Sequence, residues 1–319
     1  MDSKELVRRA IEFDYPERIP LRYCTNIEKG NLIILPIPEH PDFSPGEPGL
    51  DEWGCLWKKM GEDIGQVVRH PVSCIEDLSK YKLPIVDIEK RFKEIKEKIS
   101  FMQNKFVVGD METSGFTRMS FLRGFDSLLC DIYTNGELFD RLADIVFSVE
   151  EELIKGWHYA GASGIYFRDD WGTQENLIIS PEMWKKLFMP RYKQQVEIIH
   201  NLGMKAMFHS CGKVNAIIGF LIEIGFDVFN SNQIELLGIQ KIADEYAGKI
   251  CFLLPVDIQR TLMEGSIEDI RNMAVRLART FGNSAGGFIG VAELADFEIA
   301  VAGTDKMKVA EEGFSSVEY

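Results

Sequence analysis

The sequence lacks the short patterns that most readily assign a chain to a class of protein. Its six cysteines are dispersed and include no CxxC pair, which favours buried thiols or a single metal ligand over a disulfide framework. Neither GxGxxG nor GxxxxGK[ST] occurs, and the late segment GGFIG does not have that spacing. An enzyme that binds a nicotinamide dinucleotide or ATP through a glycine-rich loop is therefore disfavoured.

Positive charge and long apolar runs are also scarce. Lysine and arginine number 36 against 50 aspartate and glutamate residues, a net charge of −14, which disfavours partners held mainly through phosphates, such as nucleic acid or an anionic membrane. The longest apolar stretch, residues 216–229, is interrupted by Glu223 and Asp227 and is shorter than the roughly 20 residues that a bilayer requires. The first twenty residues contain no apolar signal core, which predicts a cytoplasmic location.

The chain is rich instead in short β-branched runs that alternate with longer amphipathic ones. From residue 105 onward this alternation predicts repeated strand-helix units around a parallel sheet. Strands are expected at residues 106–111, 164–168, 205–208, 227–230, 250–255 and 286–290, with an early strand at 18–24 after a helix at 4–13. Seven strands are close to the eight of a (β/α)8 TIM barrel, although the spacing also fits a doubly wound open sheet.

The whole chain, residues 1–319, is interpreted as one domain. Residues 1–104 form an N-terminal part with the first strand and loops, including a proline-rich stretch at 35–48; residues 105–293 carry the main repeats; residues 294–319 form a divergent tail. Helices are expected at 119–132, 136–160, 181–202, 214–224, 237–246 and 267–281.

Polar side chains follow most of the predicted strands. In a barrel the active site lies at the carboxyl ends of the strands. The residues found there are Asp110 and Glu112; Asp169, Asp170 and Trp171; His209 and Cys211; Asn230 and Gln233; Asp257; and Glu293. Any one of them alone is more simply a loop residue or a helix cap, but their convergence from six strands predicts a functional site at one mouth of the barrel.

His209 and Cys211 form the sharpest local pattern. At the end of an extended strand, residues two apart point the same way and can bind one metal ion, and imidazole and thiolate are both zinc ligands. A histidine bonded to a backbone carbonyl beside a buried cysteine is the alternative interpretation. Glu293 is the best-placed third ligand, and Cys251, at the start of its strand, is expected at the opposite end of the barrel. The other candidates for the third ligand are Gln233, Asp257, Asp169 and Asp170.

Asp169 and Asp170, together with Glu112, are the candidate catalytic residues. Adjacent carboxylates that cannot both ionise freely can give one of them a raised pKa, as a general acid or base requires. Consecutive residues point in different directions, so only one of the pair is expected to enter the site. Trp171 and Gln174 are expected to hold a flat substrate or cofactor, with burial in the core as the alternative for the tryptophan. The remaining candidates for cofactor binding are Asp110, Asn230, Gln233 and Asp257.

Several longer segments, taken together, resemble one family. They are SKELVRRAIEFDYPERIPL, DEWGCLWKKMGEDIGQVVRHP with DLSKYKLP, GDMETSGFTRMSFLRGFDSLLCDIYTN, GIYFRDDWGTQENLIISPEMWKKLFMPRYK, HSCGKVNAIIGFLIEIGFDVFNSNQ and GGFIG. They cover most of the chain and are similar to the uroporphyrinogen decarboxylase superfamily, and within it to the corrinoid-linked methyltransferase and O-demethylase-like branch. The resemblance implies a (β/α)8 barrel whose open mouth receives a large tetrapyrrole-type cofactor or a methylated substrate.

Departures from the family pattern bear on function. Decarboxylases of the family carry an arginine-rich MRQAGR stretch after the first strand, where this chain reads YCTNIEKGNLIILP, and a GFSGAPWTL-like stretch where it reads TSGFTRMSFLRGF, so porphyrin decarboxylation is disfavoured. In the family's zinc-dependent methyltransferases a cysteine near the last strand joins the HxC pair. His209 and Cys211 match that pair, but residues 286–293 contain no cysteine, so the resemblance implies that Glu293 or water completes any zinc site.

The expected function is methyl transfer between a corrinoid such as methylcobalamin, carried by a partner protein, and a small thiol, folate or methoxylated compound. Zinc would keep a substrate thiol deprotonated. Without zinc, Asp169, Asp170 and Glu112 would control the protonation of a folate nitrogen. The alternatives are a decarboxylase of a tetrapyrrole or smaller acid, and a corrinoid-binding or tetrapyrrole-binding barrel without catalysis. The sequence leaves a homodimer open.

Overall fold

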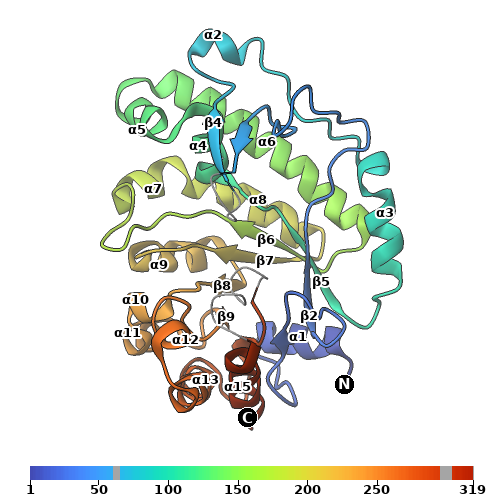
Figure 1. The fold of residues 1–319 in the computed structure, drawn as a ribbon, viewed down its shortest axis with the longest axis vertical. Coiled ribbons are helices and arrows are strands. Elements are labelled where there is room, and N and C mark those ends of the chain that lie inside the picture. Colours follow the sequence, from blue (N-terminus) through green and yellow to red (C-terminus); the bar gives the residue numbers. More distant parts are fainter. Residues whose placement is uncertain (60–64, 295–303, 319) are drawn as a thin grey trace.

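Eight parallel strands close into a barrel in the computed structural model, which describes residues 1–59, 65–294 and 304–318 (Figure 1). Around the barrel the order is β1, β10, β9, β8, β7, β6, β5 and β2, and β2 pairs again with β1. The strands are β1 (Leu21–Arg22), β2 (Leu32–Leu35), β5 (Phe106–Asp110), β6 (Gly164–Arg168), β7 (Lys205–His209), β8 (Val228–Asn230), β9 (Cys251–Leu254) and β10 (Phe288–Val291). The predicted (β/α)8 barrel is confirmed.

The eighth strand is β2, which the strand-helix pattern does not predict. Its four residues, LIIL, pair with Phe106–Gly109 of β5 on one side and with Arg22 of β1 on the other. The run is short, precedes the proline-rich stretch, and is not followed directly by an amphipathic helix. Only pairing with strands on both sides therefore defines it as part of the barrel.

Helices surround the strands, and Figure 1 shows α6, α8 and α9 lying alongside β6 and β7. The helices are α3 (Ile88–Ser100), α4 (Gly115–Arg123), α5 (Phe125–Thr134), α6 (Gly136–Ala160), α7 (Pro181–Leu187), α8 (Met189–Asn201), α9 (Asn215–Ile224), α10 (Ile234–Leu237), α11 (Ile239–Tyr246), α12 (Thr261–Glu264) and α13 (Ile267–Phe281). Helices α6 and α13 have the predicted bounds. The helix expected at 119–132 is instead two helices, because Gly124 takes a φ of +88° that ends α4.

One end of the barrel is covered by α1 (Ser3–Glu12), which contacts β2, β5, β9 and β10. The N–H of Gly287, just before β10, donates a hydrogen bond to the carbonyl oxygen of Ala10 at 2.8 Å. The apolar face of α1 is buried against the strands through Leu6, Val7, Ala10 and Ile11. A ligand must therefore reach the barrel at the opposite end, where the strands finish.

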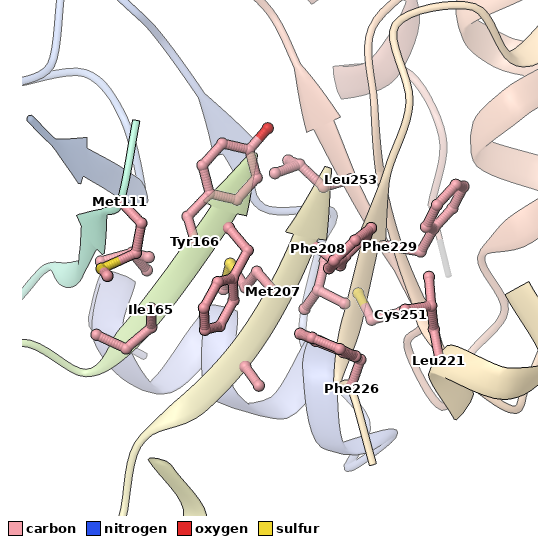
Figure 2. Close-up of a cluster of buried hydrophobic side chains, with 14 of the residues drawn as sticks. Met111, Ile165, Tyr166, Met207, Phe208, Leu221, Phe226, Phe229, Cys251 and Leu253 are labelled. Atoms are coloured by element: carbon pink, nitrogen blue, oxygen red, sulfur yellow. The ribbon is translucent and has the colours of Figure 1, made fainter. Parts of the chain in front are cut away.

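The barrel interior and the layer between strands and helices are filled by alternating side chains. On β7, Phe208 packs outward against Tyr192 of α8, with ring centroids 5.5 Å apart, while His209 points to the inside. Figure 2 shows part of this core, with labelled residues from β6, β7, β8 and β9 and Leu221 of α9. Within the described residues, no helix combines the length and apolar character needed to cross a bilayer.

Two segments lie outside this regular pattern. Between β2 and α3 the chain forms a small antiparallel sheet of β3 (Leu56–Lys58) and β4 (Gln66–Arg69), followed by α2 (Ile75–Leu78). After β10, α15 (Thr304–Ser315) packs against α13, and its Phe314 ring lies 5.7 Å from that of Phe288. The described part of the divergent tail thus supplies the last helix of the barrel.

Candidate metal centre at the barrel mouth

The ends of three neighbouring strands set the geometry of the site. Arg168 pairs in register with His209, and His209 with Asn230, so the last residues of β6, β7 and β8 lie side by side. Side chains at paired positions of a parallel sheet point to the same face, and here that face is the inside of the barrel. The predicted convergence of polar groups at the mouth therefore has a structural basis in the register of these strands.

His209, Cys211 and Asp170 form a compact cluster whose ligand atoms all lie within 4.8 Å of one another. The Cys211 Sγ atom is 3.4 Å from His209 Nε2, and the Asp170 Oδ1 atom is 3.7 Å from the same nitrogen. The Cys211 N–H also donates to Asp170 Oδ1 at 2.7 Å, which holds the carboxylate beside the thiol. The side chain of Asp170 is 54% exposed and that of His209 9%, so solvent reaches the cluster from the carboxylate side.

The tautomer of His209 follows from its neighbours. The amide nitrogen of Asn230 donates to the carbonyl oxygen of Leu253, which turns the amide oxygen toward the barrel interior. That oxygen accepts from the Tyr166 hydroxyl at 2.7 Å and from His209 Nδ1 at 2.5 Å. Because Nδ1 must carry the proton that it donates, Nε2 presents a lone pair to Cys211 and Asp170, as a metal-binding histidine does.

The donor set fits zinc. Zn–N distances of about 2.0–2.1 Å and a Zn–S distance of about 2.3 Å place the nitrogen and sulfur of a tetrahedral site roughly 3.6 Å apart. The observed separation of Nε2 and Sγ is 3.4 Å. One nitrogen, one sulfur and one carboxylate oxygen would supply three ligands to a zinc ion and would leave a fourth position for water or substrate.

Asp169, in contrast, is fully buried and acts on the fold. Its carboxylate accepts hydrogen bonds from the backbone N–H groups of Phe116 and Thr117, from the Thr117 hydroxyl at 2.7 Å and from the Tyr192 hydroxyl. It therefore binds the amino end of α4, where helix N–H groups have no partner within the helix. Burial raises the pKa of Asp169 to about 7, against the opposing effect of the hydrogen bonds from Tyr192 and Thr117. The expectation that only one of the two aspartates enters the site agrees with this geometry, and that residue is Asp170.

Three of the predicted cofactor contacts are in the interior and must be corrected. Asn230 is 1% exposed, and its amide is hydrogen-bonded to Tyr166, His209 and Leu253. Trp171 is 0% exposed and packs against Phe116 and Phe188, with ring centroids 4.6 and 4.5 Å away, because the chain turns inward after Asp170. Asp257 is 1% exposed, and its carboxylate accepts from three backbone N–H groups, those of Glu235, Gln259 and Arg260. The side chains of Trp171 and Asp257 stabilise the loops behind the mouth and present no free surface to a ligand.

Gln174 and Gln233 lie on the loops that follow β6 and β8. Gln174 is exposed on the loop that follows Trp171. Gln233 accepts a hydrogen bond from the Gly212 N–H at 2.9 Å, which fixes the turn immediately after Cys211. Gln233 thus supports the turn that follows Cys211.

Glu293 does not join the cluster, although the sequence favours it as the third ligand. Its Oε2 atom accepts from the backbone N–H groups of Thr25 and Asn26, at 2.9 and 2.8 Å. These hydrogen bonds hold the carboxylate against the loop after β1, the strand next to β10 in the barrel. Cys251 is fully buried at the first position of β9, as expected, and burial raises the pKa of its thiol.

Asp110 and Glu112 lie at the end of β5, on the far side of Arg168 from the cluster. Asp110 forms an ion pair with Arg168 and accepts from the Glu112 N–H at 2.7 Å. Glu112 has a φ of +57°, a left-handed conformation that is uncommon for a residue with a side chain. The pKa of Glu112 is raised, first because surrounding protein atoms displace water from its carboxylate and second because the negative charge of Asp110 is nearby.

Three residues that sequence reasoning missed support the site. The Tyr166 hydroxyl and the Arg168 guanidinium position Asn230 and Asp110, and the Thr117 hydroxyl, besides bonding Asp169, accepts from the Asp170 N–H at 3.1 Å. The period of two along β6 is a signal for the first pair, because Tyr166 and Arg168 must share one face of the strand. No pattern in the sequence indicates Thr117.

The chain is similar to known proteins in structure and in sequence. A methyltransferase from Methanosarcina mazei has a similar structure with a TM-score of 0.63 and 16% sequence identity, and the match covers 98% of this chain and 85% of that one. A 3-keto-D-glucoside 4-epimerase from E. coli matches with a TM-score of 0.46 and 10% identity, over 77% of this chain and 97% of that one. No curated protein matches the sequence. The family model for uroporphyrinogen decarboxylase (URO-D) matches residues 54–290, and the chain therefore belongs to the URO-D family.

Proposed function

We propose that the protein is a zinc-dependent methyltransferase that moves a methyl group between a corrinoid, carried by a partner protein, and a small thiol. Membership of the URO-D family and the similarity to a methyltransferase structure support the reaction class. The single observation that carries the proposal is the cluster of His209, Cys211 and Asp170, with Asn230 holding the imidazole in the tautomer that binds metal.

The residues of the cluster divide the work of holding the ion. His209 offers a neutral nitrogen, Cys211 a sulfur, and Asp170 a carboxylate oxygen in place of the second cysteine of the family's zinc-dependent methyltransferases. Zinc bound there would keep a substrate sulfur deprotonated, as a thiolate, at neutral pH. Because oxygen is a harder ligand than sulfur, the site is expected to hold zinc less tightly than a site with two cysteines.

The surroundings of the cluster suit a large second substrate. Since α1 covers the other end of the barrel, a corrinoid on a partner protein has to approach the open mouth, where Asp170 is exposed. The buried pair of Tyr166 and Asn230 excludes water from the inner side of His209, so proton exchange at Nδ1 is restricted. The outer side of the cluster alone is left for the acceptor sulfur.

Metal analysis and methyl transfer test this proposal together. The purified protein loaded with zinc should hold about one ion per chain and should transfer the methyl group of methylcobalamin to 2-mercaptoethanol. His209→Ala and Cys211→Ser should lose both properties and stay folded. Glu293→Ala is the matched control, because its carboxylate is bonded to the loop after β1 and should not affect zinc content.

Each outcome has a defined meaning. Wild-type protein that transfers methyl groups at an undiminished rate after zinc removal would exclude the metal from the mechanism. Transfer to tetrahydrofolate and not to the thiol would assign a nitrogen acceptor. A folded, zinc-loaded protein that transfers to neither acceptor would contradict the proposal.

A further inference from the structure

A second site is formed beside the mouth by a cavity of about 370 Å³ that none of Asp170, His209 and Cys211 lines. One wall is formed by Asp51, Glu52 and Trp53, from the segment between β2 and β3, and by Trp57 of β3. The residues after β5 and side chains of α4 and α6 form the opposite wall. This volume falls in the range of small-molecule sites.

Arg118 of α4 lines the cavity with a guanidinium group that lacks acceptors. The residue is 7% exposed, its Nε atom is buried without a partner, and no hydrogen bond links its side chain to any residue of 1–59, 65–294 or 304–318. The nearest carboxylate oxygen, Asp51 Oδ2, is 3.8 Å from Nη1 and already accepts from Trp57 Nε1. The Nε–H group is thus held out of water without an acceptor, and the planar fork of the guanidinium matches a carboxylate.

Arg91 lines the same cavity, and in contrast to Arg118 its guanidinium donates hydrogen bonds to several protein acceptors. Its guanidinium donates to the carbonyl oxygens of Pro38 and Ile85, at 2.9 and 2.8 Å, and pairs with Glu52. Arg91 therefore has a structural role that Arg118 does not share. The difference between the two residues marks Arg118 as the group that is left for a ligand.

The cavity also contains carboxylates without donors. Among the described residues, none donates a hydrogen bond to the side chain of Glu112 or Glu39. Glu52 pairs with Arg91 through Oε1, but its buried Oε2 has no partner. A purely anionic ligand would meet these carboxylates, and a purely cationic one would meet Arg118, so neither kind of ligand satisfies both groups.

The remaining walls are apolar. Ile37, Trp53, Trp57, Met111 and Leu153 line the space between the charged groups, and the Arg118 guanidinium stacks over the Trp53 ring at 4.8 Å. Aromatic and aliphatic walls favour a ligand that has an apolar part as well as its charges.

We propose that this cavity binds a small zwitterion of the amino-acid type, with its carboxylate on Arg118, its ammonium group toward Glu112, and an apolar side chain between the tryptophans. One ligand of this class gives a hydrogen-bond acceptor to the Arg118 guanidinium and a donor to carboxylate oxygens that have none. The site does not depend on zinc or on methyl transfer, and its test can be made on metal-free protein.

Binding measurements with matched probes test the inference. The twenty protein amino acids are added one at a time and the shift of the unfolding midpoint is recorded; at least one apolar amino acid should raise it. Calorimetry then compares L-phenylalanine with 3-phenylpropionate, which lacks the ammonium group, and 2-phenylethylamine, which lacks the carboxylate. Each single-charge analogue should bind about 10- to 100-fold more weakly than the zwitterion.

Two variants separate the two charged ends. Arg118→Gln should weaken the amino acid and 3-phenylpropionate alike, whereas Glu112→Gln should weaken the amino acid and strengthen 3-phenylpropionate. Arg141→Gln, on the exposed side of α6, is the control for loss of an arginine. Circular dichroism shows whether Arg118→Gln is folded, and the exposed Glu112 variant keeps the test valid if it is not.

The inference is overturned if no amino acid shifts the midpoint. It is also overturned if 3-phenylpropionate equals L-phenylalanine in affinity and Glu112→Gln changes neither, because the cavity would then be a plain anion site. Since the readout is binding without metal, these results are independent of whether the methyltransferase proposal holds.

Discussion

Asp169 and Asp170 are neighbours in the chain and belong to two different regions of the molecule. The region around Asp169 is a buried network of carboxylate and hydroxyl groups beneath α4, which includes Tyr192, Thr117 and Glu150. The region around Asp170 is an open cluster with a histidine and a cysteine. The same side-chain chemistry stabilises a helix in the first region and offers a metal ligand in the second.

Exposure, more than residue type, separates the roles of Asp169 and Asp170. Both carboxylate oxygens of Asp169 accept hydrogen bonds from groups within the protein, so neither oxygen is available to a ligand. Asp170 accepts one backbone hydrogen bond, and its side chain is 54% exposed. The two roles can belong to consecutive residues because neighbouring side chains at the end of β6 point in opposite directions.

The largest expected effect comes from removing His209 from the exposed cluster that it forms with Cys211 and Asp170. His209→Ala should abolish zinc retention and lower single-turnover methyl transfer from methylcobalamin by roughly 10³-fold or more, since the ion is expected to supply several kcal/mol of activation. The free energy of unfolding should fall by about 1–3 kcal/mol, because the imidazole is buried and donates to Asn230, and the barrel should stay folded. Elemental analysis and stopped-flow kinetics measure the two effects. Retention of a full equivalent of zinc would show that the cluster is not the metal site.

The next effect sharpens the contrast between the two aspartates. Asp169→Asn should lower the free energy of unfolding by about 2–4 kcal/mol, because an amide cannot accept from all of the four donors that now face the carboxylate. Asp170→Asn should change it by less than about 0.5 kcal/mol, since the side chain is half-exposed, and should weaken zinc binding instead. Urea denaturation and a chelator competition measure both variants. Equal stability losses would remove the distinction between the regions.

A smaller effect tests the orientation of His209. Asn230→Ala removes the oxygen that accepts from Nδ1 and should weaken zinc binding by about 10- to 100-fold. Tyr166→Phe is the matched control, because it deletes only the other donor to that oxygen and leaves the imidazole held. A chelator titration ranks the three proteins. If both variants bind zinc as tightly as the wild type, Asn230 does not set the tautomer.

The smallest expected effect is a pH dependence in the buried region. Burial raises the pKa of Glu150 to about 7 in the folded protein, from an ordinary value of 4.5. Between these two values the folded protein holds a proton that the unfolded chain has lost, so the free energy of unfolding falls as pH rises from about 4.5 to 7. Glu150→Gln removes this titrating group. The free energy of unfolding of the variant, relative to that of the wild type, should therefore be higher at pH 8 than at pH 4.5 by about 1–2 kcal/mol. Denaturation at both pH values checks the sign, and a constant difference would place the Glu150 pKa near its ordinary value.

Much of the fold could be predicted from the sequence, and the failures have physical causes. The helices α6 and α13 have bounds that capping residues and periodicity define, so local information is sufficient. The strand β2 has no local signal beyond four apolar residues, and only its pairing with β1 and β5 makes it a strand. Trp171 follows two aspartates at a strand end, a position typical of a site, and its burial depends on aromatic rings from α4 and from the end of α7.

The sequence by itself determined the alternation of strands and helices, the placement of polar groups at the strand ends, and the pairing of His209 with Cys211 at a spacing of two. These are properties of backbone geometry over a few residues, which the order of residue types carries directly. The tertiary structure alone decided that the third member of the cluster is Asp170 and not Glu293. Asp170 follows β6, which is next to β7, and the Cys211 N–H holds its carboxylate in the cluster, whereas the N–H groups of the loop after β1 hold the Glu293 carboxylate. Both contacts join segments that are far apart in the sequence, so the order of residue types does not carry them.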